Sequence, residues 1–209
     1  MPFGTLLISM STGMNNDTSL ASNRKRRYPP ASSSSVAEPR RPLLLAVFAF
    51  ARAARDCPGV HRISLLGSIL TTKAIPKDVD VLVAIDAAMD LTRLAQSGRR
   101  LMGQAQSINR GADIFLADAA GRYLGRICHY RECHPRVLCP AQHCGLRDHL
   151  NDDLHIVTLS QELIASPPLE LWPKVIRRLS VPTDVEETLL NKLDQNRKRP
   201  FPASQLQRR

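Results

Sequence analysis

The stretch from residue 61 to residue 85 constrains the fold more than any other part of this 209-residue chain. It reads HRISLLGSILTTKAIPKDVDVLVAI: an apolar run, a Gly-Ser pair, and two aspartates one residue apart in a second apolar run. Successive side chains of a β-strand point to opposite faces, so Asp78 and Asp80 share one face. Val79 and Val81 point to the other face. The alternation therefore predicts a strand with a buried side and a side that carries two carboxylates.

Paired carboxylates on such a strand repel each other and are costly to remove from water. A divalent cation relieves both problems, and Mg²⁺ is commonly held by one or two carboxylates together with substrate phosphates. Gly67 lets the backbone approach a ligand closely, and Ser68 adds a hydroxyl donor at the start of a helix whose free N–H groups attract phosphate. The stretch thus predicts a triphosphate-binding turn beside a magnesium site.

A family resemblance rests on these residues. Gly67-Ser68, nine further residues and then Asp78-Val79-Asp80 resemble the signature of the polymerase-β-like nucleotidyltransferase superfamily, especially its small minimal members. Such proteins carry a third carboxylate between apolar residues on a neighbouring strand, and Asp113 matches it, with Asp118 as a competitor. The resemblance covers residues 41–118 approximately. Minimal members often have an Arg-Gly pair where this chain has Thr71-Thr72-Lys73, which separates it from the antitoxin branch of toxin–antitoxin systems.

The resemblance implies a specific chemistry. Asp78, Asp80 and Asp113 would hold two Mg²⁺ ions, and Gly67, Ser68, Lys73 and Lys77 would bind the nucleotide. An NMP would pass from an NTP to an acceptor that the sequence does not identify, and pyrophosphate would leave. Two alternatives remain open. The Asp-x-Asp pair can sit on a metal-free strand edge, and a degenerate copy of the fold can bind nucleic acid or a protein partner instead.

A second cluster of chemistry-bearing residues lies at 128–149, with the sequence CHYRECHPRVLCPAQHCGLRDH. Its cysteines are Cys128, Cys133, Cys139 and Cys144, and its histidines are His129, His134, His143 and His149. Thiolate and imidazole are the ligands that Zn²⁺ prefers, four at a time in a tetrahedron. We therefore expect structural Zn²⁺ on the four cysteines, with a Cys3His set using His134, His143 or His149 as a variant. Free buried cysteines with surface histidines are the alternative, and a redox relay lacks its C-x-x-C spacing.

Apolar periodicity and turn residues predict the remaining elements. We expect strands over 61–66, 78–85, 112–117 and 154–159. A helix is expected over 42–56, a short one after Ser68, and another after a cap at Asp86. Two more are expected later: one after Pro167-Pro168, with Trp172 on its apolar face, and one from a capping box at 183–186. The order of elements predicts an α/β (α+β) fold: a nucleotidyltransferase-type mixed sheet flanked by helices, with a Cys/His-rich zinc-binding insertion and C-terminal helices.

Charge divides the chain into a core and two tails. The net charge of +10 is concentrated at residues 1–42 and 191–209, which carry +4 and +5. We expect a disordered basic tail over 1–41, one domain over 42–195 and a basic tail over 196–209. Such tails attract nucleic acid without reading its sequence, or are simply solvated. Aromatic residues make up only 4% of the chain, which disfavours a base-stacking platform. No apolar run is long enough for a membrane span, so we expect a cytoplasmic protein.

Overall fold

The computed structural model describes residues 40–133, 139, 141–144 and 146–197, which fall within one compact unit, residues 37–209. The expected tail over 1–41 lies outside the described residues as far as residue 39, and the expected C-terminal tail lies outside them from residue 198. The elements are α1 (Arg40–Ala54), β1 (Val60–Leu66), the 3-10 turn η1 (Ser68–Leu70), β2 (Asp78–Ile85), α2 (Thr92–Gln106), β3 (Gly111–Asp118), β4 (Tyr123–Ile127), β5 (Leu150–Asn151), α3 (Gln161–Ala165), β6 (Leu169–Trp172), β7 (Ile176–Arg177), α4 (Thr183–Val185), the π-helical segment η2 (Glu186–Leu190) and α5 (Asn191–Arg197).

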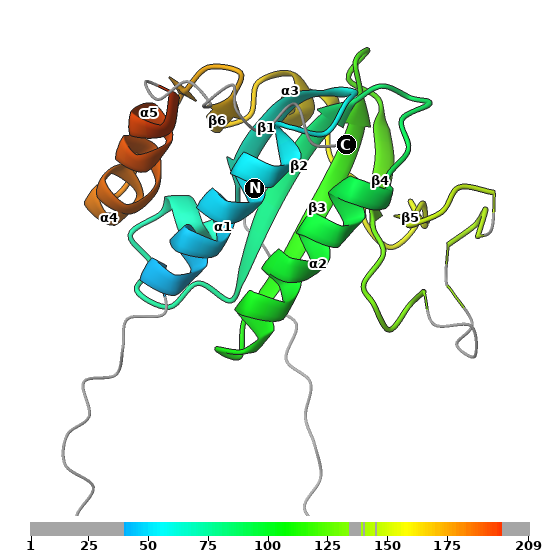
Figure 1. Cartoon of the computed structure of the whole chain (residues 1–209), viewed down its shortest axis with the longest axis horizontal. Helices are drawn as coiled ribbons and strands as arrows, with labels where there is room; N and C mark the ends of the chain where they lie inside the picture. Colours follow the sequence, from blue (N-terminus) through cyan, green and yellow to red (C-terminus); the bar gives the residue numbers. More distant parts are fainter. Residues whose placement is uncertain (1–39, 134–138, 140, 145, 198–209) are drawn as a thin grey trace, which may run out of the picture. The chain divides into compact units, whose positions relative to one another are not determined.

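The strands form a mixed sheet of seven strands in the order β5-β4-β3-β2-β1-β6-β7 (Figure 1). β2 and β3 run parallel, and each of the other neighbouring pairs is antiparallel. The parallel pair needs a crossover, which α2 supplies. This mixed α+β architecture agrees with the fold class expected from the sequence.

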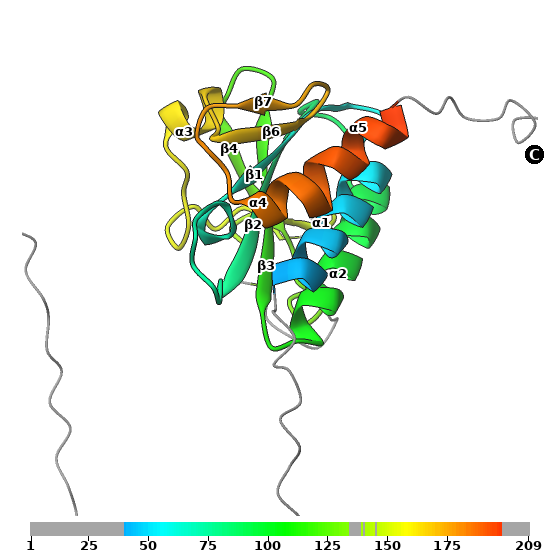
Figure 2. The same ribbon diagram turned by 90° about the vertical axis from the view of Figure 1, so that its left-hand side faces the viewer.

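The two faces of the sheet are covered differently (Figure 2). Helices α1 and α2 lie side by side on one face, and the main core there includes Val79, Val81 and Ile114. The opposite face has a smaller core, to which α3 contributes Ile164 and the later parts of β2 and β3 contribute Leu82 and Phe115. The first residues of β2 and β3 on that face are therefore only partly covered.

Most elements expected before residue 120 are present. The strand over 78–85 has the predicted bounds. The strand expected over 61–66 begins one residue earlier, and the strand expected over 112–117 is longer by one residue at each end. The expected helix over 42–56 instead begins at Arg40, and its outer face is solvated, since Leu45 is exposed. The prediction that Asp86 caps the next helix was wrong. Helix α2 begins at Thr92, whose backbone N–H donates to Asp90, and the side chain of Asp86 is hydrogen-bonded to His61 instead.

Three expectations in the second half were wrong or incomplete. No strand forms over 154–159, which is turn and loop. The helix expected around Trp172 is the β6–β7 hairpin, because Trp172 pairs with Ile63 of β1 and leaves no room for a helix. The final helix is present, but its capping box is not, because Glu186 pairs with Arg177 instead. The short helix α3 is capped by Ser160, whose hydroxyl accepts the backbone N–H of Leu163.

Arg40 joins the first helix to two distant parts of the chain. Its guanidinium, almost fully buried, donates to both carboxylate oxygens of Asp184 at 2.6 and 3.1 Å. It also donates to the backbone oxygens of Ile69 and Lys73 at 2.9 and 2.7 Å. These bonds hold the loop between η1 and β2 against α1.

Within the described residues, no helix is both long and apolar enough to cross a membrane.

Candidate functional site

Asp78, Asp80 and Asp113, here named the aspartate cluster, lie on one face at the start of the two parallel strands. Asp80 and Asp113 are direct partners in the β2–β3 register. Because the alternating residues Val79 and Val81 are buried under α1 and α2, the carboxylates point to the opposite, less covered face. All three side chains are half-buried. The structure therefore brings together the three carboxylates that the sequence singled out.

Asp80 carries an electrostatic cost in this arrangement. Burial, and then the neighbouring charges of Asp78 and Asp113, raise the pKa of Asp80 to about 6. In the part of the chain that the structure describes, the carboxylates of Asp78 and Asp80 have no hydrogen-bond or ion-pair partner. Two half-buried carboxylates are therefore left without a compensating cation from the protein.

Gly67 and Ser68 close over Asp80. Gly67 has φ of 76° and ψ of −162°, a conformation that favours glycine. A Cβ at this position would lie 2.3 Å from Oδ2 of Asp80, so a larger residue would displace the Asp80 carboxylate or the turn. The Oγ of Ser68 is buried and has no hydrogen-bond partner. The helix that follows is a three-residue 3-10 turn, shorter than a phosphate-binding helix, so an anion here would meet mainly the Gly67-Ser68 backbone and this hydroxyl.

Asp113 differs from the other two carboxylates because it has a partner. Nε2 of His129 lies 3.0 Å from Oδ1 of Asp113, and this hydrogen bond lowers the pKa of Asp113 although burial opposes it. Glu132 accepts the backbone N–H of His129 at 2.9 Å and pairs through both oxygens with Arg126 of β4. A turn after β4 is thus fastened against the aspartate cluster.

The sequence analysis also considered Lys73, Lys77 and Asp118 for this site. Lys73 and Lys77 are exposed on the loop before β2, and their side chains have no ion-pair partner within the described residues. Asp118 lies at the far end of β3, where it accepts from Arg122 at 2.8 and 3.0 Å. This removes Asp118 as the competitor of Asp113 for the third position.

Cys128, Cys133, Cys139 and Cys144, here named the cysteine cluster, come together as two neighbouring pairs. Cys128 is buried, and burial together with a hydrogen bond to Cys133 raises the pKa of its thiol. Cys144 is hydrogen-bonded to Cys139. Each pair also affects the other: the charge of Cys139 raises the pKa of Cys128, and the charge of Cys133 raises the pKa of Cys144.

Two of the histidines expected as alternative zinc ligands have other partners. The ring Nδ1 of His143 bonds the carboxylate of Asp152. The ring Nδ1 of His149 lies 3.2 Å from a guanidinium nitrogen of Arg99. His134 lies outside the described residues. Among the residues that are described, no three His, Cys, Asp or Glu side chains form a group that could hold a metal ion.

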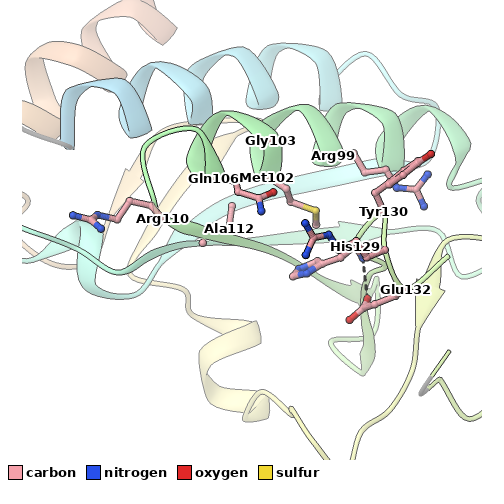
Figure 3. A pocket seen from close by; sticks show the side chains of 11 residues that line it. Arg99, Met102, Gly103, Gln106, Arg110, Ala112, His129, Tyr130 and Glu132 are labelled. Atoms are coloured by element: carbon pink, nitrogen blue, oxygen red, sulfur yellow. Dashed lines mark hydrogen bonds between the residues drawn. The ribbon is translucent and has the colours of Figure 1, made fainter. Parts of the chain in front are cut away.

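A cavity of about 440 Å³ lies beside this region (Figure 3). It is bordered by the second half of α2, the start of β3 and residues 129–132, with Met102, Ala112 and Tyr130 among its lining residues. Ala112 belongs to the helix-covered face of β3, whereas Asp113 belongs to the other. The cavity is therefore distinct from the aspartate cluster, although the turn that carries His129 and the residue Gly111 border both.

Sequence reasoning missed the contribution of β4 and the turn after it. His129 was assigned to the Cys/His segment, whereas the structure places it at the aspartate cluster together with Arg126 of β4. The alternation of YLGRI over 123–127 was the available signal, because it would have predicted a strand pairing with β3. Comparisons of the chain with protein-family models, with curated proteins and with solved structures gave no match.

Proposed function

We propose that this protein is a nucleotidyltransferase that passes an NMP from an NTP to an acceptor. The observation that carries the proposal is the pairing of two unpartnered, half-buried carboxylates, Asp78 and Asp80, with a glycine turn that packs directly against the Asp80 carboxylate. The fold does not need this arrangement for stability, since the charges repel each other. Residues kept in a costly arrangement indicate a ligand.

The carboxylates fit magnesium. Mg²⁺ needs hard oxygen ligands and usually takes one or two carboxylates, with substrate phosphates completing its shell. Asp78 and Asp80 supply these, and Asp113 lies next to Asp80 in the register. Among the described residues no three His, Cys, Asp or Glu side chains form a group that could hold a metal ion, so the nucleotide would have to supply the remaining ligands. When bound, Mg²⁺ would neutralise charge on the transferred phosphoryl group and on the departing pyrophosphate.

The remaining roles follow from the contacts. The buried hydroxyl of Ser68 has no partner, so it can donate to a phosphate oxygen, and the open backbone at Gly67 allows that phosphate to come close. Oδ1 of Asp113 is engaged by His129, which leaves Oδ2 to accept the proton of an attacking hydroxyl. The lowered pKa of Asp113 keeps this carboxylate ionised at neutral pH, although it also makes the carboxylate a weaker base.

The test is transfer of label from NTPs radiolabelled at the α-phosphate, with Mg²⁺, to the protein itself and to a cell extract. Wild type should label an acceptor with at least one of the four NTPs, and Asp80→Asn should reduce labelling to background. Asp86→Asn is the matched control, because Asp86 follows β2 directly, is exposed and bonds His61 at 2.6 Å. It should transfer as wild type does.

Two outcomes would contradict the proposal. Equal labelling by wild type and Asp80→Asn would separate the activity from the aspartate cluster. Absence of labelling with every NTP would favour a degenerate copy that binds nucleic acid or a partner through its zinc segment and basic tails. That protein should still bind nucleic acid after Asp80→Asn, and the binding should weaken with salt.

A further inference from the structure

The cavity of about 440 Å³ beside the aspartate cluster has a cationic lining. Three arginines border it: Arg99 of α2, Arg110 before β3, and Arg131 of the turn after β4. Among the described residues that line it, Glu132 is the one carboxylate, and Arg126 already binds both of its oxygens. Guanidinium groups carry a permanent positive charge in proteins. The cavity therefore holds positive charge that its described lining does not neutralise.

Arg99 is the arginine best placed to bind a ligand. Its side chain is half-buried, and its buried Nε has no hydrogen-bond partner in the described part of the chain. One terminal nitrogen lies 3.2 Å from Nδ1 of His149, which leaves the rest of the guanidinium fork for a phosphate or a carboxylate. Arg110 differs, because its side chain points away toward the opposite end of the cavity and donates to the oxygen of Asn109 at 2.7 Å (Figure 3). An anion therefore fits the Arg99 end.

The same end of the cavity offers an aromatic ring and an apolar side chain. Tyr130, whose side chain is exposed, and Met102 of α2 line the cavity with Arg99 (Figure 3). One ring is too little for a single-strand platform, but it is enough to stack on one planar group. Gly103 lies at the exposed rim, where a Cβ would meet nothing within 4 Å, so we assign it no ligand contact. The cavity has the size of a small-molecule site, about 300–1,000 Å³.

Two residues connect this cavity to the aspartate cluster. His129 lines the cavity, and its Nε2 lies 3.0 Å from Oδ1 of Asp113. Gly111 also lines the cavity, and it is the partner of Asp78 in the β2–β3 register. Gly111 is exposed and has no side chain, so it leaves the edge of the sheet open at this point. A ligand in the cavity is thus separated from the carboxylates by one imidazole and by bare backbone.

We propose that this cavity binds the acceptor of nucleotide transfer, and that the acceptor is a small phosphorylated compound with a planar ring and a free hydroxyl. Phosphate suits the cavity better than carboxylate, because a phosphate monoester carries about −1.5 to −2 charge at neutral pH and can neutralise two guanidinium groups. Arg99 and Arg131 bind the phosphate, and Tyr130 contacts the ring. The acceptor role rests on the proposed function, whereas binding to the cavity does not.

The bonds made and broken in transfer assign a place to the hydroxyl of this compound. Its oxygen forms a bond to the α-phosphorus of the NTP, and the bond from that phosphorus to the oxygen of the departing pyrophosphate breaks. The hydroxyl proton passes to Oδ2 of Asp113, and pyrophosphate leaves with the electron pair of the broken bond. The product is a phosphodiester between the NMP and the acceptor.

The first experiment measures binding of the four nucleoside 5′-monophosphates to the full chain by calorimetry, without NTP and without divalent ions. At least one should bind, and Arg99→Gln should weaken its affinity about ten-fold or more, because hydrogen bonds between charged groups are lost. Arg100→Gln is the matched control, since Arg100 is the next residue of α2, is exposed and does not line the cavity. It should bind as wild type does.

A second variant keeps the test valid if Arg99→Gln does not fold. Arg131 is exposed and has no ion-pair partner among the described residues, so Arg131→Gln should fold and should also weaken binding. Failure of all four monophosphates to bind would overturn the proposal. Binding that neither variant weakens would belong to another basic part of the chain and would also overturn it.

Three further probes separate the parts of the ligand. Tyr130→Ala should weaken monophosphate binding about five-fold or more, because stacking on the ring is lost, while Tyr130→Phe should not. Inorganic phosphate should bind more weakly and should not respond to Tyr130→Ala, and a nucleoside without phosphate should bind more weakly still. 4-Hydroxybenzoate has a ring, a hydroxyl and a single carboxylate. If it bound more tightly than the monophosphates, the assignment of phosphate would be overturned.

Ser68→Ala tests whether the ligand occupies the Gly67-Ser68 turn instead of the cavity. Because Ser68 does not line the cavity, monophosphate binding without divalent ions should be unchanged. A loss as large as that of Arg99→Gln would place the ligand at the turn and overturn the proposal.

Transfer to the bound compound tests the acceptor role. With an NTP radiolabelled at the α-phosphate and Mg²⁺, the monophosphate that binds should become labelled, and Arg99→Gln should raise its KM more than it lowers kcat. Transfer to a different acceptor, unaffected by Arg99→Gln, would overturn the acceptor role and leave the proposed function standing. Binding to the cavity without transfer from any NTP would count against the proposed function and the acceptor role, and would keep the binding site.

Discussion

The aspartate cluster and the cysteine cluster are positioned by different parts of the fold. The aspartates stand on two central, hydrogen-bonded strands, and their separation is set by the register of β2 and β3. The cysteines begin where β4 ends and are carried by turns that include few long-range hydrogen bonds among the described residues. A site built on strands is rigid before any ligand arrives, whereas a site built on turns gains its order from the ligand.

The two clusters also differ in how their charge is managed. The aspartates are carboxylates held near one another on two central strands. The thiols of Cys128 and Cys144 stay protonated, because their surroundings raise the pKa of both. We therefore expect damage to the aspartate cluster to change activity and leave the fold, and damage to the cysteine cluster to change local order.

Gly67→Ala should break the aspartate cluster with the largest effect. The new Cβ would lie 2.3 Å from Oδ2 of Asp80 on a backbone with φ of 76°, so the Asp80 carboxylate or the turn must shift. Displacing reacting groups by about 1 Å can lower a rate about hundred-fold, and we expect a loss of at least that size in nucleotide transfer.

Gly103→Ala is the control for this prediction. Gly103 is an exposed residue within α2, and a Cβ there would meet nothing within 4 Å. Transfer should be that of wild type, and the fold should gain about 0.5–1 kcal/mol from the better helix former. If both variants lost activity equally, the close approach of Gly67 to Asp80 would not be what matters.

Arg40→Ala should weaken the support behind the aspartate cluster. The guanidinium makes four hydrogen bonds, to Asp184, Ile69 and Lys73, which fasten the loop before β2. Because Asp184 is one-third exposed and can be solvated when its partner is lost, we expect a cost of about 2 kcal/mol, below the range for fully buried pairs. Urea unfolding measures this free energy.

The neighbouring exposed arginine gives the comparison for that measurement. Arg41→Ala should change the free energy of unfolding by no more than about 0.5 kcal/mol. A similar cost for both variants would show that net charge at the start of α1, rather than the buried contacts of Arg40, determines stability.

The smallest expected effect is that of Asp80→Asn, which should raise the free energy of unfolding at neutral pH. The pKa of Asp80 is raised to about 6, so the folded state binds the proton more tightly than the unfolded state does. The associated stability is present below about pH 4 and is lost as the pH rises through about 6. The variant should therefore gain about 1 kcal/mol at about pH 8, discounted because Asp80 is half-exposed, and nothing at about pH 4.

Unfolding in urea without divalent ions measures this difference at both pH values. Added Mg²⁺ should shrink it, because the ion stabilises wild type and not the variant. A gain of equal size at about pH 4 would mean that the amide packs better and that charge repulsion is not the cause.

Local patterns in the sequence determined the first half of the aspartate cluster. The alternation around Asp78 and Asp80 is a property of one strand, and the Gly67-Ser68 turn is a property of two residues, so neither needed tertiary information. Asp113 was found through the family resemblance, which calls for a third carboxylate between apolar residues of a neighbouring strand. Binding of magnesium, zinc and an NTP remains a set of predictions.

Only the tertiary structure decided what surrounds these residues. The strands β5 and β7 have two residues each, too few for a periodic signal, and β6 forms because Trp172, Glu170 and Leu169 pair with β1. The contact of His129 with Asp113 joins residues 16 apart in sequence through the pairing of β3 with β4. Side-chain alternation repeats within a strand and can be read from its residues, whereas the partner of a strand depends on the whole chain.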